Sequence, residues 1–504
     1  MRTKNSAKNI IAGLSISFTM TLLGFLTRKV FVDQVGIEYL GLNGLLQNIL
    51  GIMSLLEGGF ATSVIYNLYK PLADNNKERV LALLQLYKKV YIFIAIGIAL
   101  FGICLFPFIK YVIHDYENLE YVGLVYFIYL FNSIIGYFIA YRWALINASQ
   151  LNYKLASINL TFQIILNISK LLVLYYTSNY ILFLLVESIC SIIQSISVVK
   201  KSNKMFPYLH DKNKYYVPSE TKHNIVTNMK ALFINQLGGY FMHSTDNIII
   251  SAFIGVSTIG YYSNYTLIIS TINTIIKQIL SGFSDSVGNL IASANDGKIY
   301  EVFKVAFFVN FLVVSIPAII IFNTITPFIS WWLGTEYTFG YGIIIVILMN
   351  FYIDMMRSTA LTFKIKSGIF VHDKYTPLLQ GVINITLSLI FVKYWGLIGV
   401  LFATAISLLS IGFWQFPRLC YRHIFNQPLS NYFKKYLYYT FVALISISIS
   451  HILCNQVLIT NQIFKTLANA LISIAVILII YFIFLSRLNE YKRFLEYISI
   501  AIRK

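Results

Sequence analysis

Two apolar stretches of the sequence carry polar residues that recur with the spacing of one helix face. At steps of four, four and three residues they hold Asn159, Gln163, Asn167 and Lys170, and then Asn273, Lys277, Ser281 and Ser284. Residues three or four apart lie on the same side of a helix. Amide and hydroxyl groups in such a stripe can hydrogen-bond the hydroxyl groups of a ligand, and each lysine adds a positive charge that suits an anion.

Other apolar stretches also carry polar residues that share one helix face. They comprise Ser17, Thr21, Gly24 and Arg28; Asn43, Gln47, Ser54 and Glu57; Glu187, Ser191 and Gln194; and Asn350, Asp354 and Arg357, continued by Lys364. A charge at the centre of a bilayer costs roughly 2.5 to 3.5 kcal/mol on insertion scales, so charged residues there face the interior of a bundle. The stripes therefore predict a polar interior between helices that are otherwise apolar.

The elements that must position these residues are membrane spans. The chain has 504 residues, of which 58% are hydrophobic and 12% charged, whereas a soluble domain has about 25% charged residues. About 20 mainly apolar residues cross a bilayer as a helix. Fourteen candidate spans follow: 9–28, 43–68, 85–109, 118–140, 154–176, 180–199, 228–254, 261–290, 303–325, 338–360, 376–393, 397–417, 433–453 and 464–486.

The net charge of +19 follows membrane topology and does not indicate a nucleic-acid partner. If the N-terminus is cytoplasmic and the spans alternate, five of the 39 Lys and Arg residues fall at outer ends: Arg28, Lys29, Lys110, Lys393 and Lys465. Lys and Arg are retained on the cytoplasmic side during insertion. We therefore expect a multi-pass protein with both termini in the cytoplasm, and we interpret the first apolar run as an uncleaved span.

A short glycine pattern is written twice in the chain. Gly36 and Gly41 recur as Gly255 and Gly260, 219 residues later, each time between the first and second spans of a half. Six spans precede the basic stretch 201–227, and six follow it before the two C-terminal spans. The sequence thus predicts a lobe over 1–200, a cytoplasmic linker over 201–227, a second lobe over 228–418, and two extra spans with a basic tail over 419–504. An even number of spans gives the two lobes the same orientation, as parallel repeats.

Three stretches carry a resemblance to a known family. They are "YLGLNGLLQNILGIMSLLEGGFATSVIYNLYKPLADNN" from Tyr39, "STDNIIISAFIGVSTIGYYSNYTLI" from Ser244 and "YWGLIGVLFATAIS" from Tyr394. The chain resembles the Wzx-type polysaccharide flippases of the multidrug/oligosaccharidyl-lipid/polysaccharide exporter superfamily. The resemblance implies an all-α polytopic fold of about 14 helices, with two six-helix lobes around a central polar cavity plus two C-terminal helices. It also implies a transporter of the bacterial cytoplasmic membrane that moves undecaprenyl-diphosphate-linked oligosaccharides across that membrane by alternating access. Its expected partners are the polymerase and chain-length proteins of the same pathway.

With that cargo in view, the polar stripes become candidate cavity residues. Lys277, Lys170 and Arg28 are expected to hold the diphosphate, while Asn159, Gln163, Asn167 and Asn273 hydrogen-bond sugar hydroxyls. Glu187 and Asp246 complete the candidates. Structural interpretations stay open: Lys170 snorkels to the interface, Lys277 pairs with Glu57, Glu187 or Asp246, and Asp246 serves helix packing or cation coupling. Asp354 and Arg357 are expected to form a local salt bridge, and amide stripes also join helices without cargo.

Several kinds of chemistry have no support in the sequence. It lacks a G-x-x-x-x-G-K-[ST] loop for ATP, so transport is expected to be secondary, with sodium or proton coupling open and no other cofactor. Its seven histidines show no paired ligand spacing, and its four cysteines are scattered, so neither a metal site nor a disulfide framework is expected. Two alternatives to the flippase remain: a multidrug exporter, which would depend on acidic cavity residues, and a membrane polysaccharide polymerase, which would need a larger extramembrane loop. We expect no enzyme activity.

Overall fold

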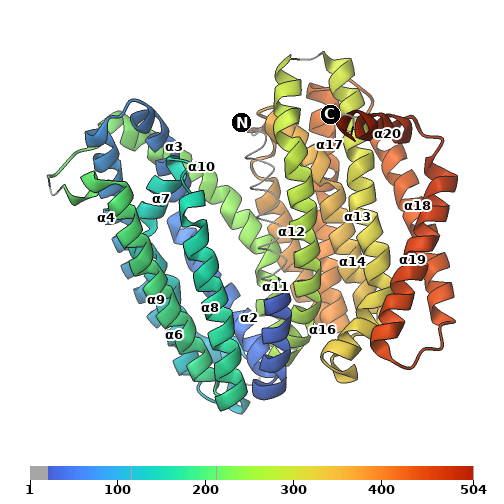
Figure 1. The fold of residues 1–504 in the computed structure, drawn as a ribbon, viewed down its shortest axis with the longest axis horizontal. Coiled ribbons are helices and arrows are strands. Elements are labelled where there is room, and N and C mark those ends of the chain that lie inside the picture. The colour runs from blue at the N-terminus through green and yellow to red at the C-terminus, as the bar shows by residue number, and fades with distance from the viewer. Residues whose placement is uncertain (1–20, 115, 212, 294, 370, 503–504) are drawn as a thin grey trace. The chain divides into compact units, whose positions relative to one another are not determined.

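The computed structural model describes residues 21–502, apart from residues 115, 212, 294 and 370, and almost all of them are helical (Figure 1). Eight helices in this part are long and apolar enough to cross a membrane, and one bent pair passes the same test together. The all-α polytopic membrane fold is therefore confirmed. By packing, the chain divides into two units, Met1–Gly260 and Tyr261–Lys504. The lobe and linker boundaries expected from the sequence stay a prediction.

The first unit is built from short and long helices in the following order. A helix over residues 21–35 leads to α2 (Ile37–Gly51), η1 (Ile52–Glu57), α3 (Phe60–Ala73), α4 (Lys77–Leu105), η2 (Phe106–Phe108), α5 (Ile109–Val112), η3 (Tyr116–Asn118), α6 (Val122–Ile135), η4 (Gly136–Phe138), α7 (Ala140–Ala148), α8 (Tyr153–Thr177), α9 (Tyr180–Met205), η5 (Pro207–His210), α10 (Ser219–His243) and α11 (Thr245–Phe253). The unit ends within the first residues of α12 (Val256–Ser293).

The second unit continues α12 and adds longer helices. These are α13 (Asp296–Trp332), η6 (Thr335–Tyr337), α14 (Tyr341–Met356), α15 (Ser358–Lys366), η7 (Val371–Asp373), α16 (Thr376–Ser410), α17 (Gly412–His423), α18 (Ser430–Asn455), α19 (Gln462–Leu485) and α20 (Asn489–Ile502). Asparagine caps the start of several long helices across the chain. The side chains of Asn76, Asn179, Asn295 and Asn461 each accept a hydrogen bond from a backbone N–H in the first turn of α4, α9, α13 and α19.

Several predicted spans are broken or bent in the structure, and most of another lies outside the described residues. Span 43–68 is divided where Gly58 and Gly59 adopt left-handed conformations, and a Cβ on Gly59 would collide with the side chain of Leu232. Span 118–140 corresponds to Val122–Phe138, which is bent by 47° relative to the next helix, Ala140–Ala148. Span 228–254 is divided between α10 and α11 at Ser244. Span 9–28 begins in residues 1–20, which the structure does not describe.

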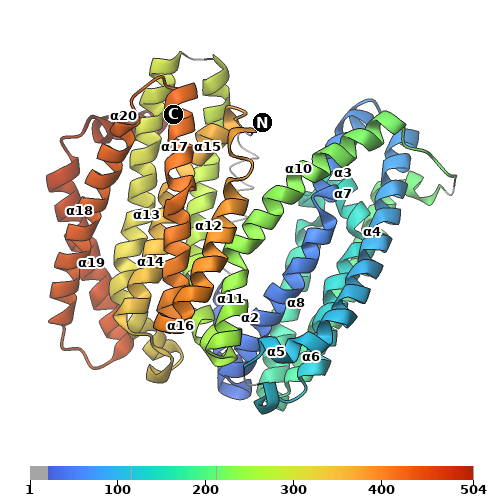
Figure 2. The ribbon, with the colours of Figure 1, turned by 180° about the vertical axis from the view of Figure 1, so that it is seen from behind.

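The spans predicted at 376–393 and 397–417 form an antiparallel hairpin. Helix α16 is interrupted at Gly396, whose φ of 54° is left-handed. Across the two arms, Gln380 donates to the backbone oxygen of Ser407 at 2.9 Å, and the Asn384 amide donates to the Thr404 hydroxyl at 2.9 Å. The second arm continues into α17. Figure 2, which views the ribbon from the side opposite to Figure 1, labels both α16 and α17. The turn at a single glycine explains how two spans are joined by so few residues.

The two copies of the glycine pattern pack against each other. Gly36 (φ 106°) and Gly255 (φ 133°) each precede the first residue of a helix, α2 and α12. A Cβ on Gly41 would collide with the carbonyl oxygen of Val256, the residue after Gly255. A Cβ on Gly260 would collide with the carbonyl oxygen of Ile37, the residue after Gly36. Both contacts lie within the first unit, and they show that the repeated pattern forms a reciprocal close crossing of two helix starts.

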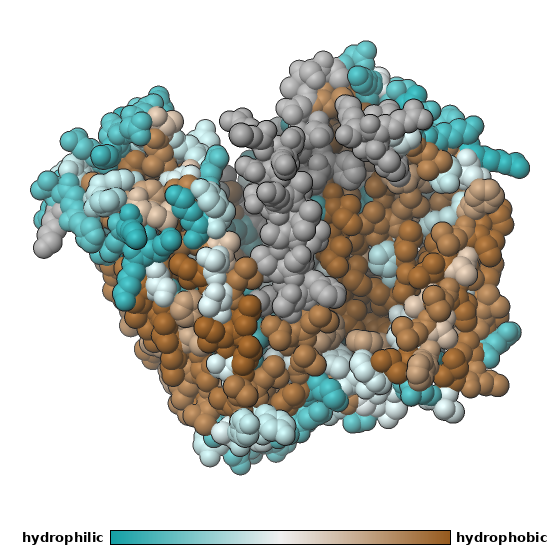
Figure 3. Space-filling view, viewed as in Figure 1, coloured by the Kyte–Doolittle hydropathy of each residue, from teal (hydrophilic) through white to brown (hydrophobic). Residues whose placement is uncertain are grey.

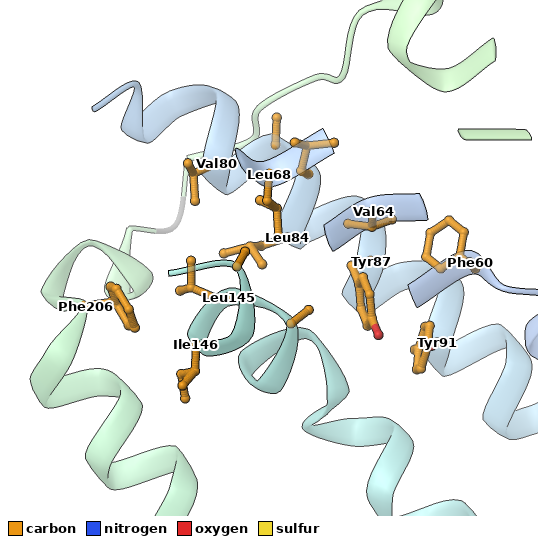
Figure 4. Packing of buried hydrophobic residues seen from close by; sticks show 14 of the residues in the cluster. Phe60, Val64, Leu68, Val80, Leu84, Tyr87, Tyr91, Leu145, Ile146 and Phe206 are labelled. Atoms are coloured by element: carbon orange, nitrogen blue, oxygen red, sulfur yellow. The ribbon is translucent and has the colours of Figure 1, made fainter. Parts of the chain in front are cut away.

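At one end of the first unit, α3, α4, α7 and the start of α10 enclose a hydrophobic cluster. Figure 4 shows Phe60, Val64 and Leu68 facing Val80, Leu84 and the Tyr87 and Tyr91 rings, with Leu145, Ile146 and Phe206 beside them. The connection after α9 is fastened to this end, because Gln85 donates to the backbone oxygen of Asn213 at 2.7 Å and accepts from the N–H of Tyr215 at 3.0 Å. Hydrogen bonds from the Asn213 N–H and the Tyr215 hydroxyl lower the pKa of the Asp211 carboxyl.

Helices α18 and α19 are joined to α13 by buried polar side chains. The Asn323 amide donates to the hydroxyls of Ser450 at 2.8 Å and Ser473 at 3.0 Å, and Asn469 donates to the Asn323 backbone oxygen at 2.9 Å. Facing away from α13, these two helices expose the apolar residues Leu437, Phe441, Leu444, Leu471, Leu478 and Phe482. Figure 3 shows hydrophobic residues over this side of the second unit. The two C-terminal helices therefore have a polar inner seam and a surface suited to lipid.

We expect Asn323→Ala to lower the free energy of unfolding by about 2 kcal/mol, because interhelical hydrogen bonds in membranes average about 0.6 kcal/mol and Asn323 makes several. The measurement is the thermal midpoint of the purified protein in detergent. Asn228→Ala is the matched control, since that asparagine is exposed within helix α10. Equal midpoints for the two variants would contradict the role of Asn323 as the centre of this seam.

Candidate functional site

In the first unit, polar and aromatic side chains from five helical segments meet in one cluster. At its centre the side-chain oxygen of Asn43, on α2, accepts hydrogen bonds from the hydroxyl of Tyr129, on α6, at 2.7 Å and from the hydroxyl of Tyr180, on α9. Two hydroxyl groups on one amide oxygen fix three helices relative to each other. We call this group, together with Lys170, Glu187, Phe183, Phe31 and Tyr39, the unit 1 cluster.

The charged part of the unit 1 cluster is an ion pair between neighbouring helices. The Lys170 ammonium, on α8, lies 2.6 Å from a Glu187 carboxylate oxygen, on α9, and 4.4 Å from the centre of the Phe183 ring. The Lys170 side chain is 13% exposed and that of Glu187 is 36% exposed. The pair is thus partly exposed, chiefly through the Glu187 carboxylate.

Aromatic rings complete the unit 1 cluster. The Phe31 ring, on the helix over 21–35, lies 5.6 Å from Tyr180 and 5.1 Å from Phe183, and the Tyr39 ring lies 5.0 Å from Tyr180. Offset and edge-on ring pairs at these distances stabilise packing and present flat apolar faces. The cluster therefore combines an ammonium group, an amide, phenolic hydroxyls and ring faces, a set that can bind a ligand with both hydroxyl and anionic groups.

The remaining residues of the α8 stripe face α9 or solvent. The Asn159 oxygen accepts from the Gln194 amide at 3.0 Å, and the Asn167 amide donates to the backbone oxygen of Gln163 at 2.8 Å. Gln163 is exposed. Only Leu155 and Leu174 of α8 are buried, so this helix packs chiefly on α9. Asn159 and Lys170 thus help to join the hairpin, as expected if the amide stripe joins helices, and the role of Gln163 in binding stays a prediction.

Arg28 and Asp246 lie elsewhere in the first unit. Arg28 is half-buried on the helix over 21–35, one turn before Phe31. Asp246 is buried, with 8% of its surface exposed, in the first turn of α11, which packs against α2. A carboxylate at that position is stabilised by the N-terminal end of the helix dipole. Its burial favours helix packing or ion binding over contact with a sugar.

Lys277 and Asn273 lie on α12 in the second unit. Lys277 is exposed, as are Ser270 and Thr274, and the three residues recur at steps of four and three. Asn273 is partly buried on the same side. The predicted stripe is therefore extended by Ser270 and Thr274 toward the N-terminus of α12. Nothing is described for the side chains of Ser281 and Ser284.

Other charged residues of the predicted stripes have intramolecular partners. Glu57 accepts a hydrogen bond from the Tyr91 hydroxyl. Asp354 lies 2.6 Å from Arg357, so the predicted local salt bridge is confirmed. Lys364 pairs with Asp373 in a buried position. These pairs lower the cost of charges inside an apolar protein.

No group of three His, Cys, Asp or Glu residues in the described part of the chain is placed to hold a metal ion. The expectation that the protein needs no metal stays a prediction. The four cysteines, Cys104, Cys190, Cys420 and Cys454, are free thiols.

Sequence reasoning missed the aromatic half of the unit 1 cluster. Tyr129, Tyr180 and Phe183 were not candidates, because aromatic residues are frequent in this chain and most are expected at membrane interfaces. One signal was present: Tyr180, Phe183 and Glu187 recur at steps of three and four, which places them on one face of α9.

The fold is similar to that of solved transporters. No family model matches the chain, and no curated protein matches it. The lipid II flippase MurJ in an inward closed conformation matches with a TM-score of 0.66 and 17% identity, covering 94% of this chain and 98% of that one.

Two multidrug transporters match over less of the chain. An inward-facing MATE-family transporter of the MOP superfamily has a TM-score of 0.57 and 14% identity, covering 80% of this chain and 96% of that one. The MATE multidrug transporter DinF-BH, solved as a complex, has a TM-score of 0.57 and 16% identity, covering 83% and 97%. At these identities the similarity shows the fold alone: the chain has the fold of MOP-superfamily transporters.

Proposed function

We propose that this protein is a secondary transporter of the Wzx type, which flips undecaprenyl-diphosphate-linked oligosaccharide units from the cytoplasmic to the outer leaflet by alternating access. The observation that carries the proposal is the exposed polar stripe of α12 with Lys277 at its end, in the predicted span 261–290. A lysine at membrane depth faces a water-filled path and not lipid. Its ammonium group is suited to the diphosphate of such a cargo.

The unit 1 cluster supports the same cargo. Its Lys170 would contact the diphosphate. Outside the cluster, Arg28 would also contact the diphosphate nearer the predicted outer end, and the amides of Asn159, Gln163, Asn167 and Asn273 would contact sugar hydroxyls. In the structure Lys170 has one carboxylate partner, Glu187, at 2.6 Å. Glu187 would therefore hold the lysine in place between transport events. Asp246, buried on α11, is our candidate for sodium or proton coupling.

The extent of the structural similarity also favours a lipid-linked cargo over a multidrug exporter. The MurJ flippase covers 94% of the chain, whereas the two multidrug transporters cover 80% and 83%. We propose that the two C-terminal helices α18 and α19 help to accommodate the prenyl chain of the lipid, in a protein of the bacterial cytoplasmic membrane that works with polymerase and chain-length proteins.

We expect cells depleted of the protein to accumulate one undecaprenyl-linked sugar unit on the cytoplasmic leaflet. Mass spectrometry of the lipid extract identifies the unit, and a membrane-impermeant glycosidase reports the leaflet. Re-expression of the wild type restores the outer-leaflet pool, and Lys277→Ala at equal protein level does not. An unchanged lipid pool with new sensitivity to cationic drugs would contradict the proposal and indicate an exporter.

A further inference from the structure

The second unit contains a polar cavity that the proposed function does not use. A cavity of about 250 Å³ lies where the C-terminal part of α13 and the start of α14 meet the end of α18 and the start of α19. Its lining includes Thr326, Ser330, Tyr341, His451, Lys465 and Asn469. In the predicted topology this end of the helices faces outside the cell.

Three lining groups are buried and have no hydrogen-bond partner within the described part of the chain. They are the Thr326 hydroxyl, the Ser330 hydroxyl and the side-chain oxygen of Asn469. Asn469 is 4% exposed, and its amide nitrogen is committed to the Asn323 backbone oxygen at 2.9 Å, so its side-chain oxygen is the atom left without a partner. An unsatisfied buried polar group costs about 1 to 3 kcal/mol. Three of them around one space indicate that a polar occupant completes the site.

The charge of the lining selects among polar occupants. Among the described residues that line the cavity, Lys465 carries a positive charge and none is an aspartate or a glutamate. A site with one ammonium group and no carboxylate disfavours a metal cation or an organic amine. It favours a ligand that carries a carboxylate or a phosphate in addition to neutral hydrogen-bonding groups.

Aromatic rings form one wall of the cavity and are held in a fixed orientation. The His451 ring lies 5.1 Å from the Tyr341 ring in an edge-on arrangement, and 5.1 Å from the Phe322 ring. Its two nitrogens lie 3.3 Å from the Asn323 oxygen and 3.1 Å from the Asn455 amide. Ring faces beside converging amides and hydroxyls suit a ligand with an apolar C–H face and a rim of hydroxyl groups.

We propose that this cavity binds an acidic saccharide at the outer end of the second unit. Thr326, Ser330 and Asn469 hydrogen-bond its hydroxyl groups, Tyr341 and His451 contact its ring, and Lys465 contacts its anionic group. The site is separate from the predicted cavity residues on α8 and α12. The choice of a saccharide rests on the proposed function, because the transported unit, or the polymer made from it, is the source of such a ligand outside the cell.

The test measures equilibrium binding of a saccharide probe to the purified full-length protein in phosphatidylcholine nanodiscs. Binding is monitored by saturation-transfer difference NMR. The probes are methyl glucuronide, which is acidic, and methyl glucoside, which is its neutral counterpart. We expect the glucuronide to bind more tightly. Thr326→Val and Lys465→Gln should each weaken it about tenfold, the effect of losing one hydrogen bond or charge contact. Lys465→Gln should also remove the preference for the acidic probe.

Two controls keep the result specific. Thr324→Val makes the same change two residues away, where the hydroxyl bonds the Ile320 backbone oxygen at 2.7 Å outside the cavity, and should leave binding unchanged. Lys110→Gln removes the charge of an exposed lysine that does not line the cavity, and it should also leave binding unchanged. Absence of a signal with the wild type would mean that water alone fills the cavity, and equal binding of both probes would remove the anionic specificity; either result overturns the proposal.

A third outcome concerns lipid. Loss of glucuronide binding when phosphatidylglycerol replaces part of the nanodisc lipid would assign the site to a lipid headgroup and overturn the saccharide assignment. Because this binding assay needs no transport, its outcome is independent of whether the chain flips lipid-linked units in cells.

Discussion

Replacing Gly41 by alanine is expected to prevent normal packing of the first unit and to abolish transport. The new methyl group would collide with the Val256 carbonyl oxygen and lie close to the Gly260 nitrogen. Both are backbone atoms at the start of α12, and neither can move without shifting the helix. Overpacking in a well-packed site costs about 1 to 3 kcal/mol and more where backbone is the obstacle, so we expect a much lower thermal midpoint and little correctly folded protein.

The control for Gly41→Ala is Gly97→Ala, on α4. A Cβ there meets no atom within 4 Å, so the variant should match or exceed the wild type in stability, since alanine favours a helix over glycine by about 1 kcal/mol. Fluorescence-detected size-exclusion chromatography of both variants after a heating series gives the comparison. A Gly41→Ala protein with the wild-type midpoint would contradict the reciprocal crossing of α2 and α12.

Removing the charge of Lys170 is expected to reduce transport by at least about tenfold, because a charged hydrogen bond to the diphosphate is worth about 1.5 to 3 kcal/mol. The single variant has a complication: Glu187 would lose its partner at 2.6 Å and stand unpaired. The double variant Lys170→Met/Glu187→Gln removes both charges. It should fold with a thermal midpoint near that of the wild type and still fail to move the lipid-linked unit to the outer leaflet.

The variant Glu187→Gln separates the two roles of the ion pair. It leaves Lys170 charged and without a competing carboxylate, so binding of the diphosphate should be retained or strengthened, although turnover slows if the cargo is held too firmly. A purely structural pair predicts instead that Lys170→Met and Glu187→Gln lose stability together and that the double variant recovers transport. The measurement is the outer-leaflet fraction of the lipid-linked unit at equal protein level.

Much of the fold followed from the sequence because the length of the apolar runs reflects the thickness of the membrane directly. The long helices α4, α8, α9, α13, α18 and α19 correspond to predicted spans, since a run of apolar residues there has no alternative to a helix. The salt bridge between Asp354 and Arg357 was also predictable, because residues at i and i+3 on a helix are neighbours. These inferences need only local spacing.

What the sequence did not predict depends on how helices meet. Glu187 was considered as a partner for Lys277, yet the structure pairs it with Lys170. The two residues stand at equal distances from the turn between α8 and α9, so the pairing depends on the register of that hairpin and not on the spacing within either helix. The junction of Asn43, Tyr129 and Tyr180 joins three helices, and no periodicity within one span reports it. The breaks at Gly58 and Ser244 reflect tertiary packing in the same way.

The reciprocal glycine crossing also limits how the sequence can vary over evolutionary time. Each glycine accommodates the backbone of the opposite copy, so a side chain gained at either position is opposed by main-chain atoms, which no substitution elsewhere can make smaller. Contacts between two side chains usually change over evolution through compensating mutations. No such mutation can compensate for a side chain at either of these two glycines. The two halves of the repeat can diverge in cargo-facing residues while these positions stay fixed in both.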